Sequence, residues 1–275
     1  MEKYHIENNT VQETLIIPLY GRKVCSEYYP NLFNDPEAEK ICNKLDYDFE
    51  TNGKKMKNIF GLFGAIEVAQ RQYDICVEIK DYLKKYPNAS VVNLGCGLDD
   101  TFHKCDNGKC SGYNIDFPDV IDIRNNLLPA KDREKNISSD LTDYSWMDKI
   151  NKNNGAIFYA TGVFYYLKTE DVKNLINELK RQFPDGVVVF DTCNNKGAKM
   201  MRKTWLKEAN IKNVDAYFSL EDPSEIKAWN SYKNVSSKSY MRGYRDIYND
   251  VNIIHKLLIQ MCEHLVKMRI IKIEL

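Results

Sequence analysis

Short apolar runs alternate with longer amphipathic stretches through the middle of the chain. The stretches 118–128 and 169–183 repeat apolar residues at the spacing of a helix. Before, between and after them lie five short runs typical of strands, at 91–94, 112–116, 136–140, 156–160 and 186–191. Strands separated by helices of this length predict βαβ units and a mainly parallel sheet.

The first third of the chain has a helical pattern instead. Residues 1–60 read mostly as helix and loop, and Asp35 followed by Pro36 has the form of a helix N-cap and a first helical residue. A longer amphipathic pattern covers residues 60–86 and ends at Pro87. We therefore expect residues 1–86 to form a helical extension or lid.

After the predicted parallel strands the pattern is less regular. It predicts helices at 195–209, 222–229 and 246–267, and strands at 235–241 and 268–275. No internal repeat or low-complexity linker divides the chain. The simplest interpretation is one domain over residues 1–275, with its core at 87–275 and an insertion at about 195–245.

The composition limits the classes of partner. Lys+Arg and Asp+Glu both number 39, so there is no excess of positive charge to favour nucleic acid. No run of about 18 apolar residues could span a membrane, and the start lacks the basic region of a signal peptide. These features predict a cytoplasmic protein without a nucleic-acid or membrane partner.

Eight cysteines are spread along the chain, as free thiols in a reducing compartment would be. A zinc site made from Cys96, Cys105, Cys110 and His103 is the alternative. Zinc sites usually begin from two closely spaced cysteines, whereas the intervals here are eight and four residues and Cys96 lies between two glycines. We therefore expect ordinary loop and core thiols and no metal.

The first predicted core strand stops abruptly within 91-VVNLGCGLDD-100. Gly95 and Gly97 leave the backbone bare where a parallel strand turns into a helix, so that a ligand can approach closely. Ligands of doubly wound sheets bind at this edge, outside the carboxyl ends of the strands. The two glycines indicate a nucleotide-like ligand, although a tight structural turn would use the same residues.

Asp116 ends the next predicted strand, 21 residues after Gly95. A carboxylate at that place can accept hydrogen bonds from a ribose diol. A dinucleotide motif would need a third glycine at position 100, but Asp99 and Asp100 stand there and would repel a pyrophosphate. The spacing favours a ribose-bearing ligand without phosphates, and S-adenosylmethionine fits this description.

Four stretches follow one another within residues 11–195: 91-VVNLGCGLDD-100, 115-IDFPDVIDIR-124, 162-GVFYYL-167 and 184-PDGVVVFDT-192. In this order they resemble the leucine carboxyl methyltransferase family, especially its bacterial branch of polyketide O-methyltransferase-like proteins. The resemblance implies an α/β fold of class I S-adenosylmethionine-dependent methyltransferases. Such a fold is Rossmann-like, with a mainly parallel seven-stranded sheet and here an N-terminal helical extension.

The resemblance also implies roles for single residues. Arg71 looks like the arginine that grips the cofactor's carboxylate, as a guanidinium can, unless it is a surface residue of the long helix. Arg22 or Lys23 would be a second basic contact. The other residues carried over are Gly95 and Gly97 at the methionine part, Asp116 with Phe117 at the ribose, Asp140 and Leu141 at the adenine, and Thr161.

Two positions depart from the family's pattern. Thr161 stands where members usually carry a glutamate, and a hydroxyl would hold the cofactor's ammonium less well than a carboxylate. The usual LDTR reads 98-LDDT-101 here. Thr161 therefore leaves one alternative open, a protein that binds the cofactor or its demethylated product without turnover. A second alternative is an NAD(P)-dependent oxidoreductase on a similar sheet, against which Asp99 and Asp100 argue.

The implied reaction is the attack of an acceptor oxygen on the sulfonium methyl, helped by orientation in a desolvated pocket. A carboxylate acceptor needs no base, whereas a phenol or alcohol does. His103, Tyr165 and Tyr166 are weak candidates for that base, because a loop histidine and packed aromatic residues explain them equally well. We expect a small-molecule acceptor, although a protein C-terminus stays open.

Overall fold

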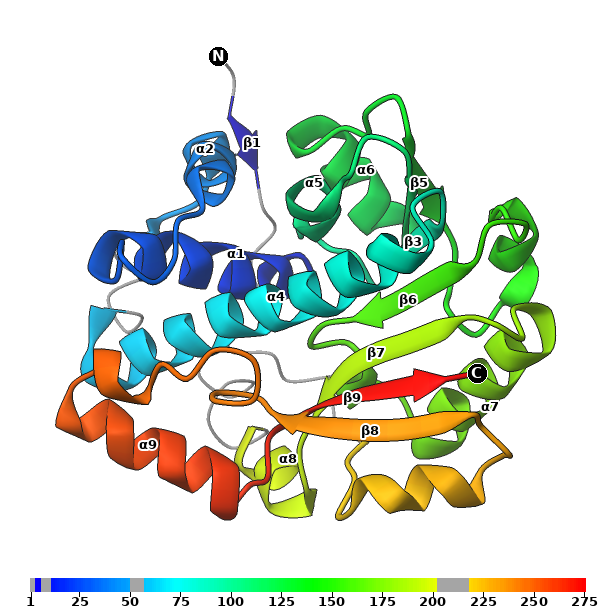
Figure 1. The fold of residues 1–275 in the computed structure, drawn as a ribbon. Helices are drawn as coiled ribbons and strands as arrows, with labels where there is room; N and C mark the ends of the chain where they lie inside the picture. The colour runs from blue at the N-terminus through cyan, green and yellow to red at the C-terminus, as the bar shows by residue number, and fades with distance from the viewer. Residues whose placement is uncertain (1–2, 6–10, 50–56, 202–217) are drawn as a thin grey trace.

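The computed structural model describes residues 3–5, 11–49, 57–201 and 218–275. Its centre is a seven-stranded sheet with helices on both faces (Figure 1). The strands, including a separate short pair, are β1 (Tyr4–His5), β2 (Leu45–Asp46), β3 (Ser90–Leu94), β4 (Ser111–Asp116), β5 (Glu134–Ser138), β6 (Ala156–Ala160), β7 (Val187–Thr192), β8 (Asn234–Ser239) and β9 (Arg269–Glu274).

The order in the large sheet is β5-β4-β3-β6-β7-β9-β8. The five strands from β3 to β7 are parallel, and β9 is antiparallel to both of its neighbours. The mainly parallel seven-stranded sheet is therefore confirmed. Because parallel strands end at the same edge, the residues that follow β3, β4, β5 and β6 lie near one another.

Eight α-helices and four 3-10 helices are described. The α-helices are α1 (Val11–Tyr28), α2 (Pro36–Asn43), α4 (Ile59–Lys85), α5 (Thr101–Cys105), α6 (Pro118–Leu127), α7 (Thr169–Gln182), α8 (Asn195–Met201) and α9 (Ile253–His264). The 3-10 helices are η2 (Tyr144–Lys149), η3 (Phe164–Tyr166), η5 (Pro223–Ala228) and η6 (Tyr248–Asp250). No helix in the described ranges is long and apolar enough to cross a membrane.

Alternation along the strands produces two cores, one on each face of the sheet. Val91 and Ile157 belong to the core shared with α1, α2, α4 and α9. Their chain neighbours Val92 and Phe158 belong to the core shared with α7. Successive side chains of a strand point to opposite faces, and a sheet buried on both faces needs apolar residues at both sets of positions. In Figure 1, α4 crosses one face and α7 lies on the other.

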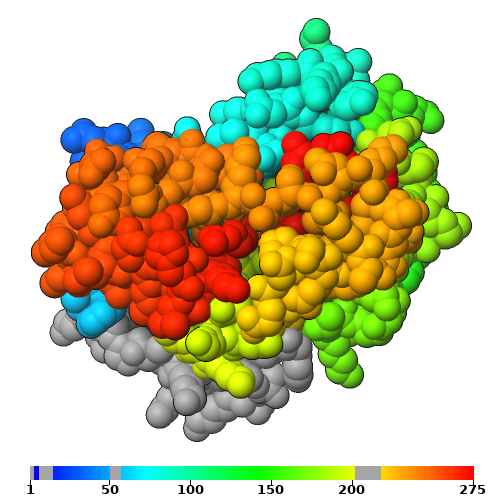
Figure 2. All heavy atoms as spheres, turned by 60° about the horizontal axis from the view of Figure 1, so that its bottom comes forward, coloured from blue at the N-terminus to red at the C-terminus, as the bar shows by residue number. Residues whose placement is uncertain are grey.

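The C-terminal part of the chain completes the sheet and one surface of the molecule. Figure 2 shows α9 beside the segments around β8 on this surface. Asn252 caps α9, since its side chain accepts a hydrogen bond from the amide of His255. All eight cysteines are free and buried.

Several predicted boundaries were wrong. α9 begins at Ile253 instead of residue 246, because η6 and its loop precede it. β5 covers Glu134–Ser138 instead of 136–140, because the buried Glu134 begins the strand and gave no apolar signal. Pro18 lies inside α1 without ending the helix. The predicted helix 195–209 is seen as α8 up to Met201, and its remainder lies outside the described residues.

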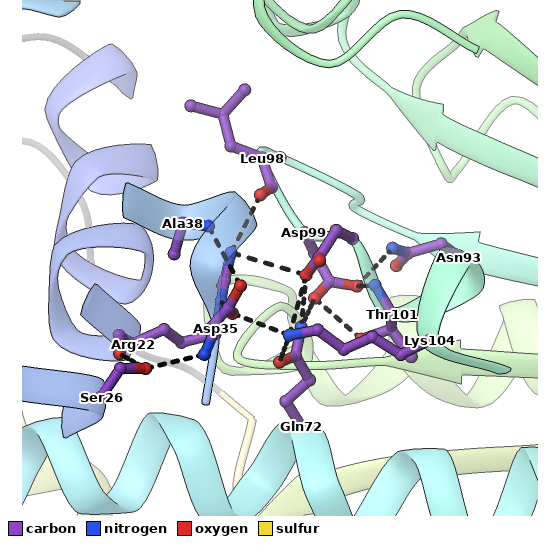
Figure 3. Close-up of polar contacts among 12 residues, drawn as sticks. Arg22, Ser26, Asp35, Ala38, Gln72, Asn93, Leu98, Asp99, Thr101 and Lys104 are labelled. Carbon is purple, nitrogen blue, oxygen red and sulfur yellow. Dashed lines mark hydrogen bonds and ion pairs between the residues drawn. The ribbon is translucent and has the colours of Figure 1, made fainter. Parts of the chain in front are cut away.

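A buried polar cluster joins the N-terminal helices to the start of the sheet (Figure 3). Arg22 of α1 donates from Nε to Asp35 Oδ2 at 2.9 Å, and Asp35 also caps α2 at the amide of Ala38. Lys104 of α5 donates to the same Asp35 oxygen at 2.7 Å. Burial disfavours the charged form, but Arg22 and Lys104 outweigh it and hold the pKa of Asp35 below its usual range.

The same cluster takes up Asp99 and Asp100. Gln72 Nε2 donates to Asp99 Oδ1 at 2.8 Å and to Asp100 Oδ1 at 2.9 Å, and Lys104 Nζ lies 3.2 Å from Asp100 Oδ1. The sequence argument treated these two acids as an unopposed pair facing a ligand. That was wrong for Asp100, whose side chain is buried against two cations, Lys104 and Arg22.

Replacing Arg22 by methionine should destabilise the fold strongly. The substitution leaves the buried carboxylates of Asp35 and Asp100 short of a partner, which typically costs about 3–5 kcal/mol. Urea unfolding measures the loss. Arg181→Met, which removes an exposed partner of Glu178, should leave the free energy of unfolding nearly unchanged. Equal midpoints for the two variants would contradict a stabilising role of the cluster.

Asp74, in the middle of α4, is a buried acid without a cation bound to it in the described ranges. Its Oδ1 accepts from Gln70 Nε2 at 2.7 Å, and Oδ2 has no hydrogen-bond partner there. Burial raises its pKa to about 9. The folded protein thus keeps this group protonated while the unfolded chain ionises it near 3.8, so stability falls as pH rises between these values.

Asp74→Asn should remove this pH dependence. Between pH 5 and pH 8 the wild type should lose stability more steeply than the variant, by up to about 1.4 kcal/mol per pH unit. Urea unfolding at three pH values measures both slopes. Asp81→Asn, on the same helix but exposed and paired with Lys84, is the control and should behave as the wild type. Parallel curves for Asp74→Asn and wild type would refute the assignment.

Candidate active site

A cavity of about 220 Å³ lies at the carboxyl ends of β3, β4 and β6. One wall comes from α1 and α4, which contribute Leu15 and Pro18, and Val68 and Gln72. Residues three and four apart lie on one face of a helix, so each helix turns one face to the cavity. All eight residues predicted to contact a cofactor line it: Arg71, Gly95, Gly97, Asp116, Phe117, Asp140, Leu141 and Thr161.

The turn after β3 needs glycine for two separate reasons. Gly95 and Gly97 have φ of +71° and +45°, which other residues rarely adopt. A Cβ at Gly95 would also lie 2.6 Å from Val163 Cγ2. The turns after β3 and β6 therefore pack against each other directly. The contact with Val163 is therefore a sufficient reason for glycine at position 95, just as a closely bound ligand would be.

Two buried arginines hold the carbonyl groups of this turn. Arg124 of α6 donates from Nη1 to the oxygens of Gly97 and Asp99, at 2.9 and 2.8 Å. Arg22 donates from Nη2 to the oxygen of Leu98 at 3.1 Å. Three consecutive carbonyls, which no regular element satisfies, thus have charged donors. Arg22 lines the cavity, but its guanidinium serves this turn and Asp35; Lys23 pairs with Glu27 and does not line the cavity.

Asp116 ends β4 beside the glycine turn. Its Oδ2 accepts from the amide of Gly97 at 2.8 Å and its Oδ1 from the amide of Phe117 at 2.8 Å. Burial raises the pKa of Asp116 despite these bonds. The carboxylate is half-buried and joins the turn after β3 to the residue that follows β4.

The loop after β5 and the residue after Asp116 supply apolar surface. Leu141 is buried and Phe117 is 48% exposed, and both line the cavity. Asp140 lies in the loop instead of at the end of a strand, since β5 stops at Ser138. Its Oδ1 accepts from the amide and the hydroxyl of Thr142, each at 2.8 Å.

Arg71 meets an acid that the sequence analysis did not identify. Its Nη1 donates to Asp191 Oδ2, near the end of β7, at 3.0 Å, and Asp191 Oδ1 accepts from the amide of Gly162 at 2.7 Å. A Cβ at Gly162, where φ is +69°, would lie 2.8 Å from Arg71 Nη1. The only sequence signal for Asp191 was an acid at the end of an apolar strand.

The structure does not bring all the proposed bases together. His103 does not line the cavity; its Nε2 lies 2.8 Å from Glu134 Oε2, at the opposite end of the sheet from the strand tips. Tyr165 is buried against Cys193 and Ala198. Tyr166 lines the cavity. Burial raises the pKa of both tyrosines, so neither is prepared to act as a base.

The cysteines of the zinc interpretation serve other contacts. Cys105 Sγ donates to the carbonyl of Cys76, and Cys110 Sγ donates to Asp106. Burial raises the pKa of Cys96 in the glycine turn. Within the described ranges, no group of three or more His, Cys, Asp and Glu side chains is placed to hold a metal ion.

Comparison with solved structures places the sheet among the Rossmann-like methyltransferase folds. A DUF574 family protein from Streptomyces avermitilis matches with a TM-score of 0.62 at 10% identity, over 95% of this chain and 96% of that one. The plantazolicin methyltransferase BpumL, solved with a triazolic desmethylPZN analog and SAH, matches with a TM-score of 0.51 at 14% identity, over 96% and 99%. Identities this low are evidence for the fold alone.

Sequence comparison goes further. The chain is 30% identical over 186 residues to the tetracenomycin polyketide synthesis O-methyltransferase TcmP of Streptomyces glaucescens. The match covers 66% of this chain and 65% of TcmP, slightly less than two thirds of that relative. Residues 20–180, more than half of the chain, match the model of one family. The chain therefore belongs to the leucine carboxyl methyltransferase family.

Proposed function

We propose that this protein is an S-adenosylmethionine-dependent O-methyltransferase acting on an oxygen of a small molecule. The observation that carries the proposal is the gathering of eight residues, chosen from sequence, around one cavity at the carboxyl ends of the strands. TcmP, the relative with 30% identity, is named for an O-methylation in polyketide synthesis. A small phenolic or carboxylic acceptor is therefore the class to test first.

The cavity's chemistry fits this cofactor. Asp116 has two carboxylate oxygens that each accept one backbone hydrogen bond, and a carboxylate has lone pairs left for a ribose diol. Phe117 and Leu141 offer apolar surface for a flat base. Arg71 offers a guanidinium for the methionine carboxylate. S-adenosylmethionine would supply an electrophilic methyl group on a sulfonium.

The protein's own contribution would be positioning and exclusion of water. α1 and α4 form a wall of the cavity, which supports the interpretation of residues 1–86 as an extension that covers it. Of the described residues that line the cavity, none is a histidine. Its carboxylates, Asp99, Asp116 and Asp140, already accept hydrogen bonds from protein groups. This arrangement favours an acceptor that ionises without help, a carboxylic acid or an acidic phenol.

Three further points belong to the proposal. The remainder of the chain, 87–275, would form one core domain with an insertion at about 195–245. The cytoplasm is the proposed location. Thr161 lines the cavity and carries no charge to hold the cofactor's ammonium group. A protein that binds the cofactor without turnover is therefore the second candidate function.

Activity and ligand class can be tested together. Isothermal titration should detect S-adenosylmethionine and its demethylated product. Incubation with methyl-labelled S-adenosylmethionine and a panel of phenols and carboxylic acids should transfer label to at least one of them. Binding without transfer to any compound favours the binding-only alternative. A thermal shift with NAD but none with S-adenosylmethionine would refute the proposal in favour of an oxidoreductase.

Asp116→Asn should weaken binding of S-adenosylmethionine about tenfold or more, because the amide keeps one acceptor oxygen and loses the charge. Titration calorimetry measures the change, and thermal unfolding checks that the turn survives. The matched control is Asp119→Asn, an exposed acid three residues away on α6. Unaltered affinity in a folded Asp116→Asn protein would argue against the ribose role.

Gly162→Ala should also weaken binding, because the new methyl group collides with the Arg71 guanidinium. Gly108→Ala is the control for backbone strain alone. The φ angle at Gly108 is +79°, similar to that at Gly162, but nothing lies within 4 Å of the added methyl group. Both variants should lose about 1 kcal/mol of stability or more from strain. Only Gly162→Ala should lose affinity, and a similar affinity for both would count against a role of Arg71 in binding.

A further inference from the structure

Asp191 is a buried acid near the edge of the cavity that the proposed chemistry does not yet use. Its side chain is 2% exposed, and it is the fifth residue of β7. β6 and β7 are parallel, and Ala160 pairs with Phe190. Thr161 follows the last residue of β6, and Asp191 follows Phe190 within β7, so the acid lies level with the loop that lines the cavity.

The two oxygens of Asp191 connect separate parts of the cavity wall. Oδ2 accepts from Arg71 Nη1 of α4 at 3.0 Å, and Oδ1 accepts from the amide of Gly162 at 2.7 Å. Arg71 and Gly162 both line the cavity, whereas Asp191 does not. A single carboxylate thus fixes the arginine, 120 residues away in sequence, against the turn after β6.

The arginine needs such a constraint. Arg71 has a long flexible side chain, and a guanidinium held in one place loses less entropy when it binds a ligand. Glycine at 162 leaves no room to spare, since a Cβ there would lie 2.8 and 3.1 Å from Arg71 Nη1 and Nη2. The guanidinium therefore lies against the turn at Gly162, and Asp191 binds both groups.

The charge of Asp191 also matters. The cavity-lining residues after β6, Thr161, Gly162 and Val163, carry no charge. Arg71 and Asp191 together are neutral, and loss of the carboxylate would add one unit of positive charge at this end of the cavity. S-adenosylmethionine has one positive charge more than its demethylated product, so loss of a nearby anion penalises the cofactor more than the product.

We propose that Asp191 is a positioning residue of the cofactor site: it holds Arg71 and the Gly162 amide in place, and its charge favours the cationic cofactor over the neutral product. The proposal rests on the proposed function. It concerns a residue that acts through Arg71, without contact to the ligand.

The test measures dissociation constants of S-adenosylmethionine and of its demethylated product for wild type and Asp191→Asn. We expect the constant for S-adenosylmethionine to rise on the order of tenfold or more. The constant for the product should rise less, so that the ratio of the two shifts by about threefold. Asp185→Asn is the control, because it removes an exposed acid near the other end of β7, paired only with Lys233 in the described ranges; both constants should stay unchanged.

A double-mutant cycle shows whether Asp191 acts through Arg71. In the Arg71→Gln background, Asp191→Asn should add little to the loss of product affinity, whereas independent roles would give additive losses. The double variant also leaves no unpaired charge. If Asp191→Asn alone unfolds, Asp191→Glu replaces it: the longer side chain keeps the charge but displaces Arg71, so both affinities should fall with their ratio unchanged, and unchanged affinities in folded Asp191→Glu would refute the positioning role.

The outcomes separate the two proposals. A wild type that binds neither compound refutes the proposed function and this inference with it. A wild type that binds both, with an unchanged ratio in folded Asp191→Asn or with additive losses in the cycle, refutes only the role of Asp191.

Discussion

The arrangement of the site depends on how the turn after β3 satisfies its backbone carbonyls. Gly97, Leu98 and Asp99 have consecutive oxygens that accept from Arg124 and Arg22, both almost completely buried. Buried backbone groups without partners are costly, and a guanidinium can serve several acceptors in fixed directions. While the arginines bind the carbonyl groups, the amide of Gly97 donates a hydrogen bond to Asp116. The turn is thus shaped by the protein before any ligand binds.

This constraint makes the N-terminal helices part of the site. Arg22 belongs to α1, yet it contacts the turn, and it also binds Asp35 at the start of α2. Lys104 ties the same acid to α5. α1 and α4 then line the cavity with residues one helical turn apart. The extension is therefore fixed to the sheet by buried charges, in addition to apolar packing.

The local pattern of the sequence was enough for the sheet and for the residues at its edge. Apolar strands, glycines with an obvious turn and an acid at a strand end are short-range signals. Ion pairs between distant segments have no such signal: Arg71 and Asp191 are 120 residues apart, and Asp35 and Lys104 are 69 apart. For the same reason the sequence left His103 as a weak candidate for the site, whereas Glu134 holds it elsewhere. The start of β5 was also mispredicted, because its first residue, Glu134, is a buried acid without an apolar signal.

The burial of all eight cysteines has a practical consequence. Alkylating reagents attack thiolates that they can reach, and here burial raises the pKa of thiols as far apart as Cys25, Cys96 and Cys193. The native protein should tolerate such reagents without modification at these positions. After a short alkylation pulse, the fraction of labelled protein would then measure how many molecules had unfolded locally. The peptide that carries the label would show which part of the fold had opened.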